Sequence, residues 1–110
     1  MSLLTIPTYS SNIIPDTITD GDTNVSNLTY TTYINKVGGA DINASLDSGY
    51  QKGQLKYLFC TVNTANTTII TPNILYDGTT LTFNASGDSA LLLWLGDAWK
   101  IMEENGVVIA

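Results

Sequence analysis

Turn-forming residues recur about every ten positions along most of this chain, and their spacing constrains the fold more than any other sequence feature. They separate short segments rich in apolar or β-branched residues, and they stand at Gly38, Gly49, residues 63–66, Gly78, Gly87, Gly96 and Gly106. Such spacing is typical of a small sandwich or barrel built from short strands.

The segments between these turns show the two-residue period of strands. Leu28, Tyr30 and Ile34 fall on one side of the chain. Residues 55–62 are apolar on both sides, which is typical of a central strand. Threonine, asparagine and serine supply 34 of the 110 residues, a composition that favours strands and tight turns over helices. We therefore expect an all-β protein with an antiparallel β-sandwich or jelly-roll-like body.

Residues 89–104 fit two different structures. A helix over this segment would gather apolar side chains on one face, namely Leu92, Leu95, Trp99 and Met102. A hairpin would instead turn at Gly96 and Asp97 and pair residues 90–95 with 98–102. We favour the hairpin, because a glycine inside a helix costs roughly 1 kcal/mol.

Trp94 and Trp99 would lie just off that turn on opposite strands, where they could form a cross-strand aromatic pair. They are candidates for the core, for a contact between subunits, or for a surface on which sugars stack. We favour the core or a subunit contact, since residues 91–93 and Ile101 surround them with apolar side chains.

The first 26 residues show no sustained period and contain Pro7 and Pro15. We therefore expect an extended N-terminal arm over residues 1–26, followed by a β-rich domain over residues 27–110. The apolar side chains of the arm cannot form one amphipathic face, and burying each is worth about 1.5 to 3 kcal/mol. We expect the arm to bind a neighbouring subunit or a larger shell, with these interface candidates: Leu3, Leu4, Ile6, Ile13 and Ile14.

The charge of the chain excludes some classes of partner. The net charge is -6, with four lysines and neither arginine nor histidine. Binding to a phosphate backbone requires clustered basic side chains, so we expect no nucleic acid partner. The longest apolar run, residues 90–95, is far too short to span a membrane, and the first residues lack the features of a signal peptide. We expect no membrane association, and synthesis in a cytosol.

The sequence offers few groups for catalysis or metal binding. Cys60 has no histidine to activate it, and we expect it to be a small buried hydrophobe. Asp20, Asp22 and Asn24 match the first ligands of a calcium loop, but valine and threonine stand where its glycine and glutamate are needed. The acidic pair at 103–104 fits a solvated turn. We expect no enzyme activity, no cofactor and no metal site.

Several short motifs of the chain follow one another in a characteristic order. They are Ala44-Ser-Leu-Asp-Ser-Gly, Gly53-Gln-Leu-Lys-Tyr-Leu, residues 67–72, Thr80-Leu-Thr-Phe, Gly87-Asp-Ser-Ala-Leu-Leu-Leu-Trp, Ala98-Trp-Lys-Ile and Asn105-Gly-Val. In this order they resemble small β-rich structural modules of tailed bacteriophages and other large double-stranded DNA viruses, which occur as virion decoration proteins and as pieces of tail and fibre proteins. The resemblance covers about residues 27–110.

The resemblance implies a non-enzymatic virion component, made in the host cytoplasm and displayed on the particle. It points first to a capsid decoration or cement protein that stabilises the shell. The alternative is a tail, fibre or host-recognition component that binds a glycan. The implied partners are further copies of the chain, most simply in a homotrimer, and the major capsid protein or other virion proteins.

Overall fold

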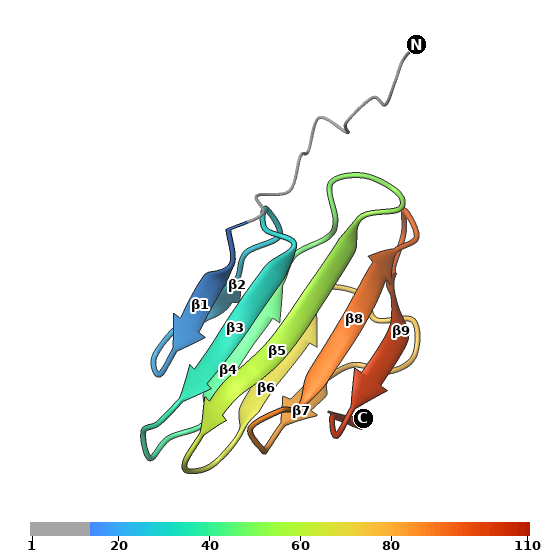
Figure 1. Ribbon diagram of the computed structural model, residues 1–110. Helices are drawn as coiled ribbons and strands as arrows, with labels where there is room; N and C mark the ends of the chain where they lie inside the picture. The colour runs from blue at the N-terminus through green and yellow to red at the C-terminus, as the bar shows by residue number, and fades with distance from the viewer. Residues whose placement is uncertain (1–13) are drawn as a thin grey trace.

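The computed structural model describes residues 14–110, and this part of the chain contains ten β-strands and no helix. The strands form two five-stranded sheets that face one another (Figure 1). Their bounds are β1 Asp16–Thr19, β2 Asn24–Val25, β3 Thr31–Lys36, β4 Ile42–Leu46, β5 Leu55–Asn63, β6 Thr68–Pro72, β7 Leu81–Phe83, β8 Ser89–Trp94, β9 Trp99–Asn105 and β10 Val108–Ile109. The expected all-β class is confirmed.

The first six strands alternate between the two sheets. Strands β1, β3 and β5 enter the front sheet, whose order is β1-β3-β5-β8-β9. Strands β2, β4 and β6 enter the back sheet, whose order is β10-β7-β6-β4-β2. Strand β1 pairs in parallel with β3, and β3 with β5. Strands β2, β4 and β6 pair in parallel in the same way. Each pair of strands β1-β2, β3-β4 and β5-β6 is therefore one coil, stacked on the next.

The expected antiparallel pairing is found in only part of the body, because both sheets are mixed. Antiparallel pairing begins only after β6, in the pairs β6-β7, β5-β8, β8-β9 and β7-β10. A two-residue period records which side of a strand is buried, but it carries no information on strand direction. The turns between β1 and β6 are spaced like those of hairpins, but they connect strands of opposite sheets. In its sheet each of these strands then pairs in parallel with the strand two positions earlier or later in the chain.

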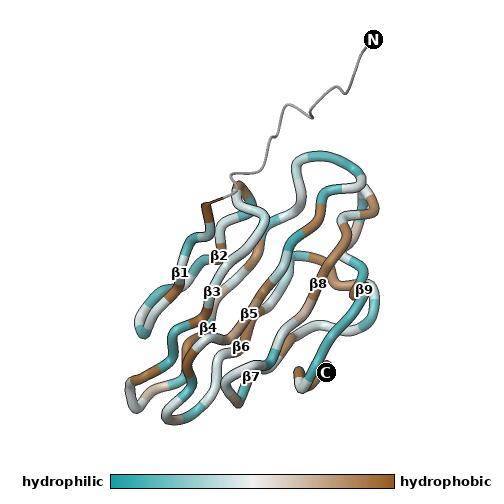
Figure 2. The backbone as a smooth tube through the Cα atoms, in the orientation of Figure 1, coloured by the Kyte–Doolittle hydropathy of each residue, from teal (hydrophilic) through white to brown (hydrophobic). Residues whose placement is uncertain are grey.

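The core lies between the two sheets and consists of the inward side chains of both. Ile18, Ile34 and Cys60 stand opposite one another on β1, β3 and β5 and are buried. Leu81 and Phe83 of β7 belong to the same core from the back sheet. Buried residues alternate with more exposed ones along β3, β4 and β8, as a strand with one buried side requires. Figure 2 shows hydrophobic residues along strands of both sheets, most continuously along β8.

The hairpin interpretation of the C-terminal third is confirmed, and the helix over 89–104 is wrong. Strands β8 and β9 pair so that Trp94 stands opposite Trp99. The amide of Leu95 donates to the carbonyl of Ala98 at 2.8 Å, which closes the turn around Gly96. Gly96 has a φ of +105°, a left-handed conformation that glycine adopts without strain.

The expected boundary at residue 26 is also wrong. Residues 16–25 supply the first strand of each sheet, and Ile18 and Val25 are 3% and 1% exposed. Four of the arm's interface candidates, Leu3, Leu4, Ile6 and Ile13, lie outside the described residues. Ile14, the first described residue, is 69% exposed. The β body therefore begins at least ten residues earlier than the sequence indicated.

Candidate functional site

An open groove of about 530 Å³ runs over the outer surface of the front sheet. We call its lining the aromatic face, defined by Thr31 and Tyr33 of β3 and by Tyr57, Phe59 and Thr61 of β5. The rings of Tyr57 and Phe59 lie 6.1 Å apart with planes within 10° of parallel. Tyr33 meets Phe59 at 6.3 Å with its plane at 70°. Three aromatic side chains thus share one surface without being buried by the opposite sheet.

Strand register extends this surface across the sheet. Tyr33 and Phe59 stand opposite one another, and Thr17 of β1 and Ser89 of β8 continue the same row at either side. In the next row Thr31 stands opposite Tyr57. Aromatic rings therefore occupy the middle of the sheet. Hydroxyl groups stand on both sides of the Tyr33–Phe59 row and on one side of Tyr57, whose other neighbour is Leu91.

Sequence analysis missed the aromatic face. It recognised residues 55–62 as apolar on both sides, but it could not say which side faces the core. Lys56 points inward with Leu58 and Cys60, whereas Tyr57 and Phe59 point outward. The usable signal was the pair of aromatic residues two positions apart in a strand whose other side already holds Leu58 and Cys60.

The two tryptophans, which were expected in the core or in a contact between subunits, lie in the core of the chain itself. Trp94 and Trp99 are 6% and 0% exposed, and their rings lie 5.2 Å apart across the hairpin. The indole nitrogen of Trp99 donates to the carbonyl of Asp47 at 3.0 Å. A side chain at Gly49 would collide with the indole of Trp94. The expected cross-strand pair is confirmed, but neither ring is available to a sugar or to another subunit.

Lys56 is fully buried in the front sheet, which the sequence did not predict. Its ammonium group donates to the hydroxyls of Thr32 at 2.6 Å and Thr29 at 2.9 Å, and to the carbonyl of Thr29 at 3.1 Å. Both hydroxyls donate onward to the carboxylate of Asp16, whose Oδ1 lies 3.9 Å from the ammonium nitrogen. Burial lowers the pKa of Lys56 from 10.5 to about 8, against the opposing effect of Asp16.

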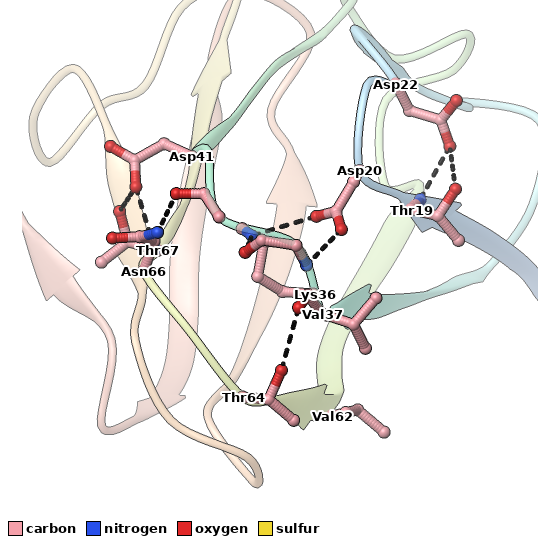
Figure 3. A network of polar contacts seen from close by, with 12 residues as sticks. Thr19, Asp20, Asp22, Lys36, Val37, Asp41, Val62, Thr64, Asn66 and Thr67 are labelled. Carbon is pink, nitrogen blue, oxygen red and sulfur yellow. Dashed lines mark hydrogen bonds and ion pairs between the residues drawn. The ribbon is translucent and has the colours of Figure 1, made fainter.

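Lys36 is the second buried lysine, and Asp20 compensates it (Figure 3). The Lys36 nitrogen lies 3.0 Å from Oδ1 of Asp20 and also donates to the carbonyl of Gly38. The hydrogen bond from Lys36, with that from the Gly38 amide, holds the pKa of Asp20 below its usual value, although partial desolvation acts in the opposite direction. Asp20, which matches the first ligand of a calcium loop, is therefore paired with Lys36.

Near Lys36 and Asp20, the connection that follows β3 is also joined to the connection that follows β5. The hydroxyl of Thr64 donates to the carbonyl of Val37 at 3.2 Å, and the hydroxyl of Thr67 donates to Asp41 at 3.1 Å. Figure 3 shows these contacts beside the Asp20 pair. Turn residues that appeared as polar breaks in the sequence thus hold the coils in register.

The remaining groups that the sequence offered for catalysis or metal binding are Cys60 and the acidic pair at 103–104, and in the structure they contribute to the core and to a turn. Cys60 is buried as expected, and desolvation raises the pKa of its thiol. The carboxylate of Glu104 accepts from the amide of Val107 at 3.1 Å, within the turn at which β9 ends. Among residues 14–110 there is no group of three or more His, Cys, Asp or Glu side chains that could hold a metal ion.

Several large apolar side chains are exposed at the end of the molecule where β1, β3 and β5 begin, at the top of Figure 1. We call it the apolar end, and its residues, from 37% to 69% exposed, are Ile14, Leu28, Tyr30, Tyr50 and Leu55. Hydrogen bonds join the three segments that carry them. Thr29 donates to Asp16 at 2.5 Å, the side chain of Gln54 donates to the carbonyl of Asn27 at 2.8 Å, and the amide of Tyr50 donates to Gln54 at 2.6 Å.

The fold and these surfaces define a small all-β protein of two mixed sheets with an uncharged aromatic groove on its front and an exposed apolar end. Comparisons with models of known families and with curated proteins find no match to this chain. Among the described residues there is no helix with the length and apolar character needed to cross a membrane.

Proposed function

We propose that this chain is a non-enzymatic structural protein of a virion, a capsid decoration or cement protein that stabilises the shell. The apolar end is the observation that supports the proposal best. A monomer in water rarely leaves several large apolar side chains exposed together unless a partner covers them. Ile14, the first described residue and one of the interface candidates, is 69% exposed at this end.

The proposed partners are further copies of the chain, in a homotrimer, and the major capsid protein or another virion protein. Closed symmetry lets one exposed surface be covered by copies of the same chain. The acidic groups support a structural role over a catalytic one, because Asp16 and Asp20 compensate buried lysines. The net charge of -6 disfavours contact with nucleic acid.

Quantitative mass spectrometry of purified particles tests this function. A shell protein is expected at hundreds of copies per particle, whereas a tail or fibre protein is expected at few. Particles that lack the protein are then incubated with purified chain, either wild type or Leu28→Asp. The wild type should restore resistance of the shell to heat, and Leu28→Asp should not. Absence of the chain from all particles would refute a virion location.

The second candidate is a tail, fibre or host-recognition component that binds a glycan. The specific observation in its favour is the aromatic face, where Tyr33, Tyr57 and Phe59 remain partly exposed amid hydroxyl groups. A low copy number in particles, together with glycan binding at this face, would favour it over a shell protein.

A further inference from the structure

We propose that the aromatic face is a binding site for neutral carbohydrate chains that lie across the strands of the front sheet. The proposal rests on the second candidate function and names its ligand class and residues. It assigns the site to Tyr33, Tyr57 and Phe59, not to the buried tryptophans.

The rings supply the apolar part of the site. A sugar ring presents C–H groups on its faces, and these pack favourably against the electron-rich surface of an aromatic ring. The ring planes of Tyr57 and Phe59 are nearly parallel, and the ring plane of Tyr33 lies at 70° to that of Phe59. Tyr33 is 37% exposed, so part of its ring remains open to a ligand. The groove thus offers aromatic contact from two orientations.

Hydroxyl groups supply the polar part. Thr17 and Ser89 stand at either side of the Tyr33–Phe59 row, and Thr31 stands beside Tyr57 in the next row. Hydroxyls both donate and accept hydrogen bonds, which matches the mixed donors and acceptors of a sugar. The hydroxyl of Thr61 already donates to the carbonyl of Ile34 at 3.1 Å, so it can only accept from a ligand. A chain that crosses the sheet would meet rings in the centre and hydroxyls beyond them.

Charge selects a neutral ligand. All five residues that line the groove are uncharged. On the outer surface of the front sheet charged residues appear at β9, where Lys100 and Glu103 stand opposite Leu93 and Leu91. An acidic glycan would approach a chain with a net charge of -6 and would be repelled. A neutral oligosaccharide carries no such penalty.

Affinity electrophoresis in gels that contain a neutral polysaccharide tests the site, with laminarin, xyloglucan, glucomannan and dextran as separate probes and hyaluronan as the acidic comparison. We expect at least one neutral polymer to retard the wild-type chain saturably, and hyaluronan not to. Calorimetry with a hexasaccharide of the retarding polymer then gives the affinity. Tyr57→Ala and Phe59→Ala should each weaken it about tenfold, which corresponds to roughly 1.4 kcal/mol.

Matched variants separate the site from the fold. Tyr50→Ala removes an exposed tyrosine at the apolar end and should leave carbohydrate affinity unchanged. Phe59→Tyr keeps the ring and should retain binding. Circular dichroism confirms that each variant is folded, which is expected because Tyr57 and Phe59 lie outside the core cluster.

Three results would overturn the proposal: no retardation by any of the four neutral polymers, binding unchanged in both Tyr57→Ala and Phe59→Ala, or equal retardation by hyaluronan. If polymers do not bind and Phe59→Ala instead changes the oligomeric state in light scattering, the face is a protein contact. Particle copy number is measured independently, so loss of the carbohydrate site leaves the virion proposal standing, and the reverse also holds.

Discussion

Lys36 and Lys56 are charged side chains inside a β body, and each is compensated by an aspartate near β1. Asp16 and Asp20 are four residues apart, at the start of β1 and just after its end, and they reach Lys56 and Lys36 respectively. A buried charge is tolerated only when it is paired and its hydrogen bonds are satisfied. The first coil is therefore held to the next two by polar contacts as well as by apolar packing.

Lys56 should make stability depend on pH in the alkaline range. Its folded pKa is about 8 and its ordinary value is 10.5, so the unfolded chain binds the additional proton between these values. Stability should therefore rise as pH increases from 8 to 10.5, by at most about 3 kcal/mol. Urea unfolding of wild type and Lys56→Met across this range gives the measurement. Because the two chains differ only at residue 56, the difference between them isolates Lys56, and an identical pH dependence would contradict the prediction.

Asp20→Asn should destabilise the chain at pH 7, because it leaves the buried ammonium of Lys36 without its carboxylate. The lowered pKa of Asp20 means that its contribution is present above 3.8 and is lost as pH falls through the lower folded value. Thermal unfolding at pH 7 and pH 3 is the check. Asp97→Asn, in the exposed hairpin turn, serves as control and should change little. Equal melting temperatures for the two variants at pH 7 would exclude this role.

At the scale of elements, the sequence revealed where strands and turns lie but not how strands pair. The hairpin β8-β9 could be predicted because its two partners are neighbours in the chain and Gly96 marks the turn. The parallel pairing between coils could not be predicted, because long connections separate the partners: Asp16 pairs with Thr32, and Thr31 pairs with Tyr57. Nothing local in the sequence distinguishes such a partner from an adjacent strand.

The residues of the candidate site could not be predicted from the sequence for a related reason. Tryptophans attract attention as binding residues, yet a hairpin buries Trp94 and Trp99 on the side that faces the back sheet. Tyr33 and Phe59 come together only because β3 and β5 are parallel neighbours in register. A site assembled from two coils becomes visible when the pairing of those coils is known.

The hairpin turn provides a test at this scale. Gly96→Ala should destabilise the chain by about 1 kcal/mol or more, because alanine is strained at the φ of +105°. Gly39→Ala is the matched control, since open space surrounds that glycine and its φ is outside the left-handed region. Gly39→Ala should be neutral or slightly stabilising in urea unfolding. Equal costs at the two positions would show that backbone strain does not govern the hairpin.

At the scale of the whole molecule, the apolar end predicts self-association. Multi-angle light scattering at micromolar concentration should show an oligomer, with a trimer expected. Leu28→Lys places a charge in this surface and should shift the population toward monomer, whereas Tyr76→Lys, at an exposed position outside it, should not. A wild-type chain that is monomeric under these conditions would contradict the prediction.

The stacked coils also determine how quickly the chain can find its structure. Parallel pairs such as Asp16–Thr32 and Ile42–Thr68 join residues far apart in sequence, so each requires a long loop to close before any contact stabilises it. Refolding should therefore be slow for a chain of this size, in the range of about milliseconds to seconds. Until β3 and β5 are paired, their edges stay open to strands of other chains. A protein of this topology is therefore expected to pair with other chains more readily while it folds than after β3 and β5 have paired.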